Sequence, residues 1–223
     1  MILKRDHSVE ISESSVGRIL KKLKVPKSLS FPRYKRKRKF MSYAKRREFK
    51  LYSQMEIGEN LQVDHMVRTI NGLTCRVFVA CDKKSKWAYA EPFLKANSKN
   101  AAKFLRHVIK NAVFPIKSIQ VDGGSEFMKE FESTCEELHI PLFVLPPASP
   151  KINGNVERMN RIITEEFLHD TLEDSLVGLR IGLKNFIEKY NTYRPHSSLK
   201  GLTPLLYIKS ILGDSLHVSY VMN

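Results

Sequence analysis

Three closely spaced runs of β-branched and aromatic residues limit this chain to folds built on an antiparallel sheet. The runs are LQVDHMVRTI at 61–70, TCRVFVACD at 74–82 and KWAYAEPF at 86–93. This composition is typical of strands, and connections this short join neighbouring antiparallel strands. We therefore expect a three-stranded meander in the first half of the chain.

Helices and strands alternate after the meander. The apolar spacing predicts short strands at 117–122 and 141–146 and helices at 97–112, 125–138, 154–170 and 173–192. A meander followed by such alternation indicates an α/β fold, with a mixed sheet flanked by helices. The apolar spacing of the last helix resembles a heptad repeat, and we expect it to pack on its own domain.

Positive charge is concentrated at the start of the chain. Residues 1–50 hold 17 Lys or Arg against 4 Asp or Glu, which is +13 of the net +15. Such runs can be solvated linkers, but a surplus this dense favours binding to nucleic-acid phosphates. Arg36, Lys37 and Arg38, in the run RYKRKRKF, are the candidate DNA contacts of this arm.

An amphipathic helix is predicted before the basic run, with Ser12 as its N-cap. The pattern fits an ordinary surface helix or the recognition helix of a helix-turn-helix, in which Arg18 and Lys22 would contact DNA. Only one helix of such a unit fits here. We therefore expect a partial helix-turn-helix over 1–25 and a basic linker over 26–56, which together form a mostly helical N-terminal arm.

Composition argues against several other classes of protein. No apolar run approaches the length of a membrane span, and the first residues lack the apolar stretch of a signal peptide. Cys75, Cys81 and Cys135 are odd in number and lack metal-binding spacing, so we expect reduced core thiols. These features predict a cytoplasmic, nucleoid-associated protein with no membrane partner.

Three carboxylates are candidates for chemistry. Asp64 lies inside the apolar run LQVDHMV, and Asp122 ends KSIQVD. An ionised carboxylate there is costly unless it is paired or binds a metal, and sites gather at the strand ends of α/β sheets. Glu157 follows 35 positions after Asp122, near the start of a helix. Three such acids can hold two Mg²⁺ ions for an in-line phosphoryl displacement.

Four local stretches carry a family resemblance. They are GENLQVDH at 58–65, VDGGSEF at 121–127, PPASPKINGNVERMNR at 146–161 and YNTYRPHSSLKGLTPLLYI at 190–208. Through them, residues 57–208 resemble the integrase catalytic core of the DDE transposase and retroviral integrase superfamily, and especially bacterial insertion-sequence transposases. The resemblance implies a ribonuclease H-like core with a C-terminal helical box, followed by a tail at 209–223.

The resemblance also implies a function. Asp64, Asp122 and Glu157 match the catalytic, metal-binding positions of the family. The implied activity is strand cleavage and strand transfer at the ends of a mobile element, with two Mg²⁺ ions that Mn²⁺ can replace. The implied partners are double-stranded DNA, at element ends and target, and further copies of the protein on that DNA. The expected DNA contacts around Glu157 are Lys151, Asn153, Asn160 and Arg161.

Other functions stay open. A catalytically silent remnant that binds element ends would keep the basic arm without the chemistry. A nuclease for RNA–DNA hybrids on the same fold ranks lower, because the helix at 97–112 lacks an acid that such enzymes use. That helix carries a basic stripe, which we interpret mainly as a solvated face. We expect structural roles for His65 and His196, because neither belongs to a His cluster.

Overall fold

The computed structural model describes residues 12–23, 43–45, 54–70, 72–145, 153–171, 173 and 175–213. The chain divides into two compact units, Met1–Lys37 and Arg38–Asn223. In the first unit, helix α2 (Glu13–Lys22) begins after Ser12, whose side chain accepts a hydrogen bond from the backbone N–H of Ser15. The predicted N-cap is therefore confirmed. Most of the predicted linker, including the RYKRKRKF run, lies outside the described residues.

The second unit is built on a mixed five-stranded sheet with the strand order β3-β2-β1-β4-β5. The three long strands form the predicted antiparallel meander, and β4 and β5 continue the sheet in parallel with β1. The strands are β1 (Leu61–Ile70), β2 (Leu73–Asp82), β3 (Ala88–Phe93), β4 (Ile119–Val121) and β5 (Leu142–Val144). The predicted fold class is confirmed.

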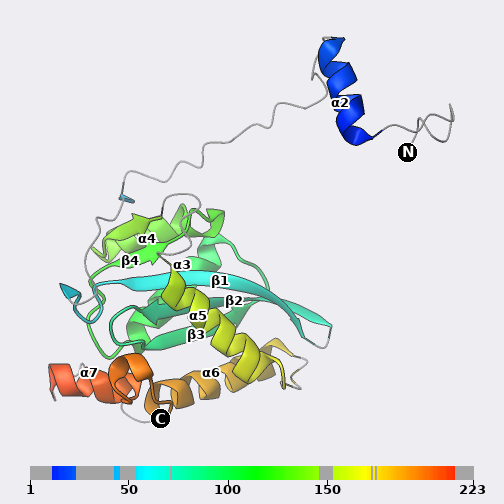
Figure 1. Ribbon diagram of the computed structural model, residues 1–223. Helices are drawn as coiled ribbons and strands as arrows, with labels where there is room; N and C mark the ends of the chain where they lie inside the picture. The colour runs from blue at the N-terminus through cyan, green and yellow to red at the C-terminus, as the bar shows by residue number, and fades with distance from the viewer. Residues whose placement is uncertain are drawn as a thin grey trace. The chain divides into compact units, whose positions relative to one another are not determined.

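Helices cover both faces of this sheet (Figure 1). One face packs against α3 (Ser98–Asn111) and α4 (Glu130–Glu137), and the other packs against α5 (Gly154–Ile163) and α6 (Leu176–Thr192). Alternate residues of β2 separate the two cores: Phe78 belongs to the α3 side, whereas Val77 and Val79 belong to the α5 side. This alternation follows from the two-residue period of a strand.

Two predicted helices are interrupted. The helix predicted over 125–138 is a 3₁₀ turn, η2 (Ser125–Phe127), followed by α4, because Lys129 adopts a left-handed φ of 50° that an α-helix excludes. The helix predicted over 154–170 is α-helical only to Ile163 and continues as a π-helical segment, η4 (Thr164–Leu168). Here the Thr164 hydroxyl donates to the Asn160 carbonyl at 2.7 Å.

The C-terminal part of the second unit packs on the same sheet. Along α6, Leu179, Leu183 and Tyr190 are buried in the core beneath α5, as the prediction of packing within the domain requires. A 3₁₀ turn, η5 (Ser197–Leu199), and helix α7 (Pro204–Leu212) follow. Helix α7 buries Ile208 in the α3-side core and extends past the domain boundary expected at residue 208.

Two predictions drawn from composition can be compared with the structure. Cys75, Cys81 and Cys135 are free and buried, as predicted. Burial raises the pKa of the Cys81 thiol to about 12, so this thiol is protonated at neutral pH. Within the described part of the chain, no helix has the length and apolar character needed to cross a membrane.

Candidate active site

Asp64 on β1 and Asp122, the residue that directly follows β4, lie towards the same face of the sheet. Strands β1 and β4 run parallel with Gln62 opposite Gln120, and the two-residue period places the aspartates on that same face one step further along. Asp64 is partly buried and Asp122 is exposed. Burial, and to a lesser degree repulsion from Asp122, raises the pKa of the Asp64 carboxyl. The structure thus brings two of the three predicted acids together.

A backbone amide orients each of the two carboxylates. The N–H of His65 donates to Oδ1 of Asp64 at 2.8 Å, and the N–H of Gly124 donates to Oδ1 of Asp122 at 2.8 Å. The second oxygen of Asp64 accepts a hydrogen bond from Nδ2 of Asn160 on α5 at 2.9 Å. The Asp64 side chain is therefore held by groups on β1 and α5, and that of Asp122 by the backbone of the turn between β4 and η2.

A buried glutamine that the sequence analysis did not select fixes the start of α5. The side-chain oxygen of Gln62 accepts the backbone N–H groups of Asn155 and Val156, each at 3.2 Å. These are among the donors that a helix leaves unpaired in its first turn. Gln62 is fully buried on the same strand face as Asp64. A polar residue two positions before Asp64 in an apolar strand was the available signal.

Glu157 lies in the first turn of α5, exposed, and one turn before Asn160. It therefore shares a helix with the residue that contacts Asp64. Among the described residues, however, no three His, Cys, Asp or Glu side chains gather closely enough to hold a metal ion. The structure does not bring Glu157 into a three-ligand group with Asp64 and Asp122.

Gly124 allows two acidic side chains to pack against one backbone position. A Cβ atom on Gly124 would lie 2.8 Å from Oδ1 of Asp122 and 2.2 Å from Oε1 of Glu126. Glu126 also contacts Nδ1 of His65 at 3.0 Å, and this hydrogen bond is the main cause of a raised pKa for His65. Sequence reasoning missed Glu126, although it lies within the VDGGSEF stretch. The contact with Glu126 agrees with the structural role expected for His65.

The described DNA-contact candidates differ in their surroundings within each unit. Arg161 is exposed on α5, whereas Asn160 contacts Asp64 and Asn153 is buried. Arg18 and Lys22 are exposed on α2, which belongs to the other unit. The remaining candidates lie outside the described residues: Arg36, Lys37, Arg38 and Lys151.

Parts of the sequence are similar to known integrases. The family model described as "Integrase core domain" matches residues 138–204, a span that contains Glu157 but neither aspartate. Residues 138–204 therefore resemble an integrase core. A putative integrase of Spiroplasma virus SpV1-C74 is 25% identical over 152 residues, which cover 60% of this chain and 42% of that protein. The likeness to integrases is therefore wider than the segment that the family model matches.

A second relative comes from a bacterial insertion element. An uncharacterized protein of insertion element IS136 from Agrobacterium fabrum is 26% identical over 96 residues, which cover 43% of this chain and 49% of that protein. The chain therefore spans less than half the length of either relative. The resemblance to integrases and insertion-sequence proteins is confirmed.

Solved structures share the fold. A chain of the simian T-cell lymphotropic virus intasome superposes with a TM-score of 0.60 at 21% identity, over 67% of this chain and 54% of that one. The integrase catalytic core domain of BIV gives a TM-score of 0.55 at 20% identity, over 70% and 98%. That of HTLV-2, in complex with magnesium, gives 0.54 at 20%, over 67% and 95%. At this identity the likeness establishes the ribonuclease H-like fold.

Proposed function

We propose that this protein is a transposase that cuts and joins DNA strands at the ends of a mobile element, with Asp64, Asp122 and Glu157 as its metal-binding acids. One observation carries the proposal. Asp64 on β1 lies beside Asp122, which directly follows the neighbouring parallel strand β4, and each is oriented by a backbone N–H. Such an arrangement presents carboxylate oxygens in a fixed direction, as a metal site requires.

The chemistry of the two aspartates fits a hard divalent cation. Both are oxygen donors, which Mg²⁺ and Mn²⁺ prefer. Their negative charges repel one another. No Lys or Arg forms an ion pair with either of them among the described residues. A cation held between Asp64 and Asp122 would remove this repulsion, and the exposed Glu157 would supply the third carboxylate.

The bound ions would supply Lewis-acid stabilisation of the reacting phosphodiester. The residues of the chain have separate tasks. Asn160 holds Asp64 through its side-chain amide, and Gln62 fixes the first turn of α5, from which Glu157 projects. Gly124 leaves room for the carboxylate of Asp122 and orients it. We propose these as positioning residues and the three acids as catalytic residues.

Cleavage of labelled DNA tests this function. Duplexes covering the DNA on either side of the gene are incubated with the full chain and Mg²⁺, Mn²⁺ or Ca²⁺, then run on a denaturing gel with and without protease. We expect cutting with Mg²⁺ or Mn²⁺, and binding with little cutting in Ca²⁺, which accepts looser coordination. Label that stays on the protein until protease treatment would contradict a mechanism without a covalent protein intermediate.

A second candidate is a catalytically silent protein that binds element ends. The absence of a three-ligand group among the described residues favours it. Binding to the duplex without cutting in any of the metals would establish this alternative. Cutting in Mg²⁺ would exclude it.

The basic arm is proposed to supply most phosphate contacts in either case, because residues 1–50 hold +13 of the net +15. Deleting them should flatten the dependence of log K on log salt concentration, since the slope falls by about 0.9 for each phosphate that the protein no longer neutralises. The measurement is DNA affinity at several salt concentrations. An unchanged slope in the deleted protein would contradict the assignment.

A further inference from the structure

A basic cavity of about 550 Å³ lies where α5, α6, the turn between β2 and β3, and the segment after α6 meet. Helix α5 contributes Asn155 and Arg158, and the β2–β3 turn contributes Lys86. The segment RPHSS, for which the sequence analysis found no chemistry, contributes Arg194 and His196. The candidate catalytic acids do not line this cavity.

Two guanidinium groups and the amine of Lys86, whose pKa is lowered by burial, line the basic cavity, and its described lining includes no carboxylate. Arg194 is fixed by Glu166 outside the lining, at 2.7 Å from its guanidinium. Lys86 is also held in place, since its Nζ donates to the Lys83 carbonyl and to Oδ1 of Asn155, both at 2.7 Å. Two carboxylates lie near these cations, Glu166 beside Arg194 and the buried Asp82 close to Lys86, so the described groups still leave a surplus of positive charge.

His196 lies among the same three cations. Its ring lies edge-on to Tyr190, with centroids 4.9 Å apart. Burial, followed by repulsion from Arg194, Lys86 and Arg158, lowers the pKa of His196 to about 4. The imidazole is therefore neutral at pH 7, and the positive charge of the cavity is carried by the Lys and Arg side chains alone.

We propose that the basic cavity binds a phosphodiester group of the DNA backbone, with Lys86, Arg158 and Arg194 as its cationic contacts. A guanidinium group can donate two parallel hydrogen bonds to the oxygens of one phosphate. The exposed hydroxyls of Ser197 and Ser198 on the cavity wall can donate further hydrogen bonds. The volume lies within the range of small-molecule sites, so a sugar attached to the phosphate also fits.

The position of the cavity connects it to the proposed active site. Arg158 directly follows Glu157 on α5, and consecutive Cα atoms are about 3.8 Å apart. A strand whose reacting phosphate reaches Glu157 can therefore place a nearby phosphate of the same strand in the cavity. The choice of DNA as the source of the phosphate rests on the proposed function. The binding of phosphate itself rests on the cavity alone.

Salt-dependent binding of the full chain to duplex DNA is the first test. Arg158→Gln removes one cation without touching the lysine–asparagine contact, and Lys86→Gln serves as a second variant. Removing the cation that neutralises one phosphate should lower the slope of log K against log salt by about 0.9. Lys103→Gln is the matched control, because Lys103 is exposed on α3 across the sheet. Equal slopes for all the variants would overturn the proposal.

The imidazole resonances of His196 give the second test, without any metal. Adding duplex DNA should raise the pKa of His196 above about 4, because a bound anion offsets the three cations, and Arg158→Gln should weaken this response. Titration with inorganic phosphate separates the sources of the ligand. A response to inorganic phosphate but not to DNA would overturn the assignment to DNA, and no response to either would overturn the cavity as a phosphate site.

These results are independent of catalysis. A chain that never cuts DNA but shows the shift of His196 on DNA binding would contradict the proposed function and support the cavity. Cutting that depends on Asp64, without any response of His196 or change of slope, would support the function and contradict the cavity.

Discussion

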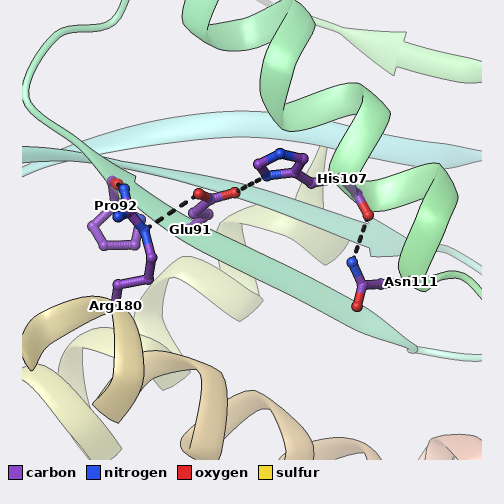
Figure 2. A network of polar contacts seen from close by, with 5 residues as sticks. All are labelled: Glu91, Pro92, His107, Asn111 and Arg180. Atoms are coloured by element: carbon purple, nitrogen blue, oxygen red, sulfur yellow. Dashed lines mark hydrogen bonds and ion pairs between the residues drawn. The ribbon is translucent and has the colours of Figure 1, made fainter. Parts of the chain in front are cut away.

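Acidic side chains in two regions of the sheet differ in whether cationic side chains contact them. On the edge strand β3, the buried Glu91 contacts Nδ1 of His107 at 2.7 Å and Nε of Arg180 at 3.3 Å (Figure 2). On β1 and after β4, Asp64 and Asp122 stand beside each other without a Lys or Arg ion pair among the described residues.

The difference separates a structural carboxylate from one available for chemistry. His107 belongs to α3 and Arg180 to α6, so Glu91 links the helices on the two faces of the sheet around its edge. Arg180 also donates to the carbonyl of Pro92 at 3.2 Å. The carboxylate of Glu91 has cationic partners within the protein, whereas the aspartate pair has no Lys or Arg partner among the described residues.

Activity should show the largest contrast between the two regions. Asp64→Asn, Asp122→Asn and Glu157→Gln should each lower metal-dependent cleavage by on the order of a thousandfold, because each removes a proposed metal ligand. Affinity for DNA should be kept. Glu91→Gln is the matched control, and its activity per folded molecule should stay within a few-fold of wild type. Rates from denaturing gels decide this, and a fully active Glu157→Gln variant would remove that residue from the site.

Stability should respond in the reverse order. Glu91→Ala should cost about 1–3 kcal/mol of unfolding free energy, since it removes the carboxylate that the partly exposed His107 and Arg180 both contact. Urea denaturation measures the loss. Glu56→Ala is the control, because its ion pair with Lys117 is exposed and should be worth less than about 1 kcal/mol. Equal losses for the two variants would show that the Glu91 contacts do not join the layers.

Asp64→Asn should not destabilise the metal-free protein. The substitution removes the repulsion with Asp122. We expect the free energy of unfolding to rise by at most about 1 kcal/mol, which is the Coulomb energy of two unit charges about 4 Å apart in water. The pKa of Asp64 is raised in the folded state, so its ionisation opposes folding at neutral pH. The gain should therefore shrink as the pH falls through this raised pKa. A loss of stability at pH 7 would mean that the carboxylate is already compensated within the protein.

The pH dependence of stability should separate two histidines that face opposite charges. His107 contacts Glu91, whereas His196 lies among cations and its pKa is lowered to about 4. Between about pH 6.5 and about pH 4, His196 is protonated in the unfolded chain but stays neutral in the folded protein. The free energy of unfolding should therefore decrease as the pH falls from about 6.5 to about 4. The His196→Gln variant should show a weaker dependence of this free energy on pH. The same slope in wild type and variant would show that His196 is not the responsible group.

The sequence predicted the elements better than the partners of their side chains. Strand alternation and the parallel pairing of β1 with β4 are enough to place Asp64 beside Asp122. Glu91 also lies in a strand-like run, and nothing local distinguishes it from Asp64. Its cationic partners are 16 and 89 positions away in the chain, so only the tertiary structure reveals them.

Local backbone breaks and the basic cavity were also beyond sequence reasoning. Lys129 has a positive φ of 50°, which residues other than glycine rarely adopt. The cavity assembles from segments that lie between residues 81 and 198, each with an ordinary local pattern. The sequence correctly placed Glu157 near the start of a helix, which is α5. That Glu157 binds a metal together with the two aspartates stays a prediction.

Binding of Mn²⁺ tests most directly whether the three acids form one site. The full chain is titrated with Mn²⁺ in the absence and presence of duplex DNA, and the free ion is followed by electron paramagnetic resonance. We expect binding by wild type and by Glu91→Gln, and weaker binding by Asp64→Asn, Asp122→Asn and Glu157→Gln. Unchanged affinity in the Glu157→Gln variant, or no binding by wild type under either condition, would contradict the account.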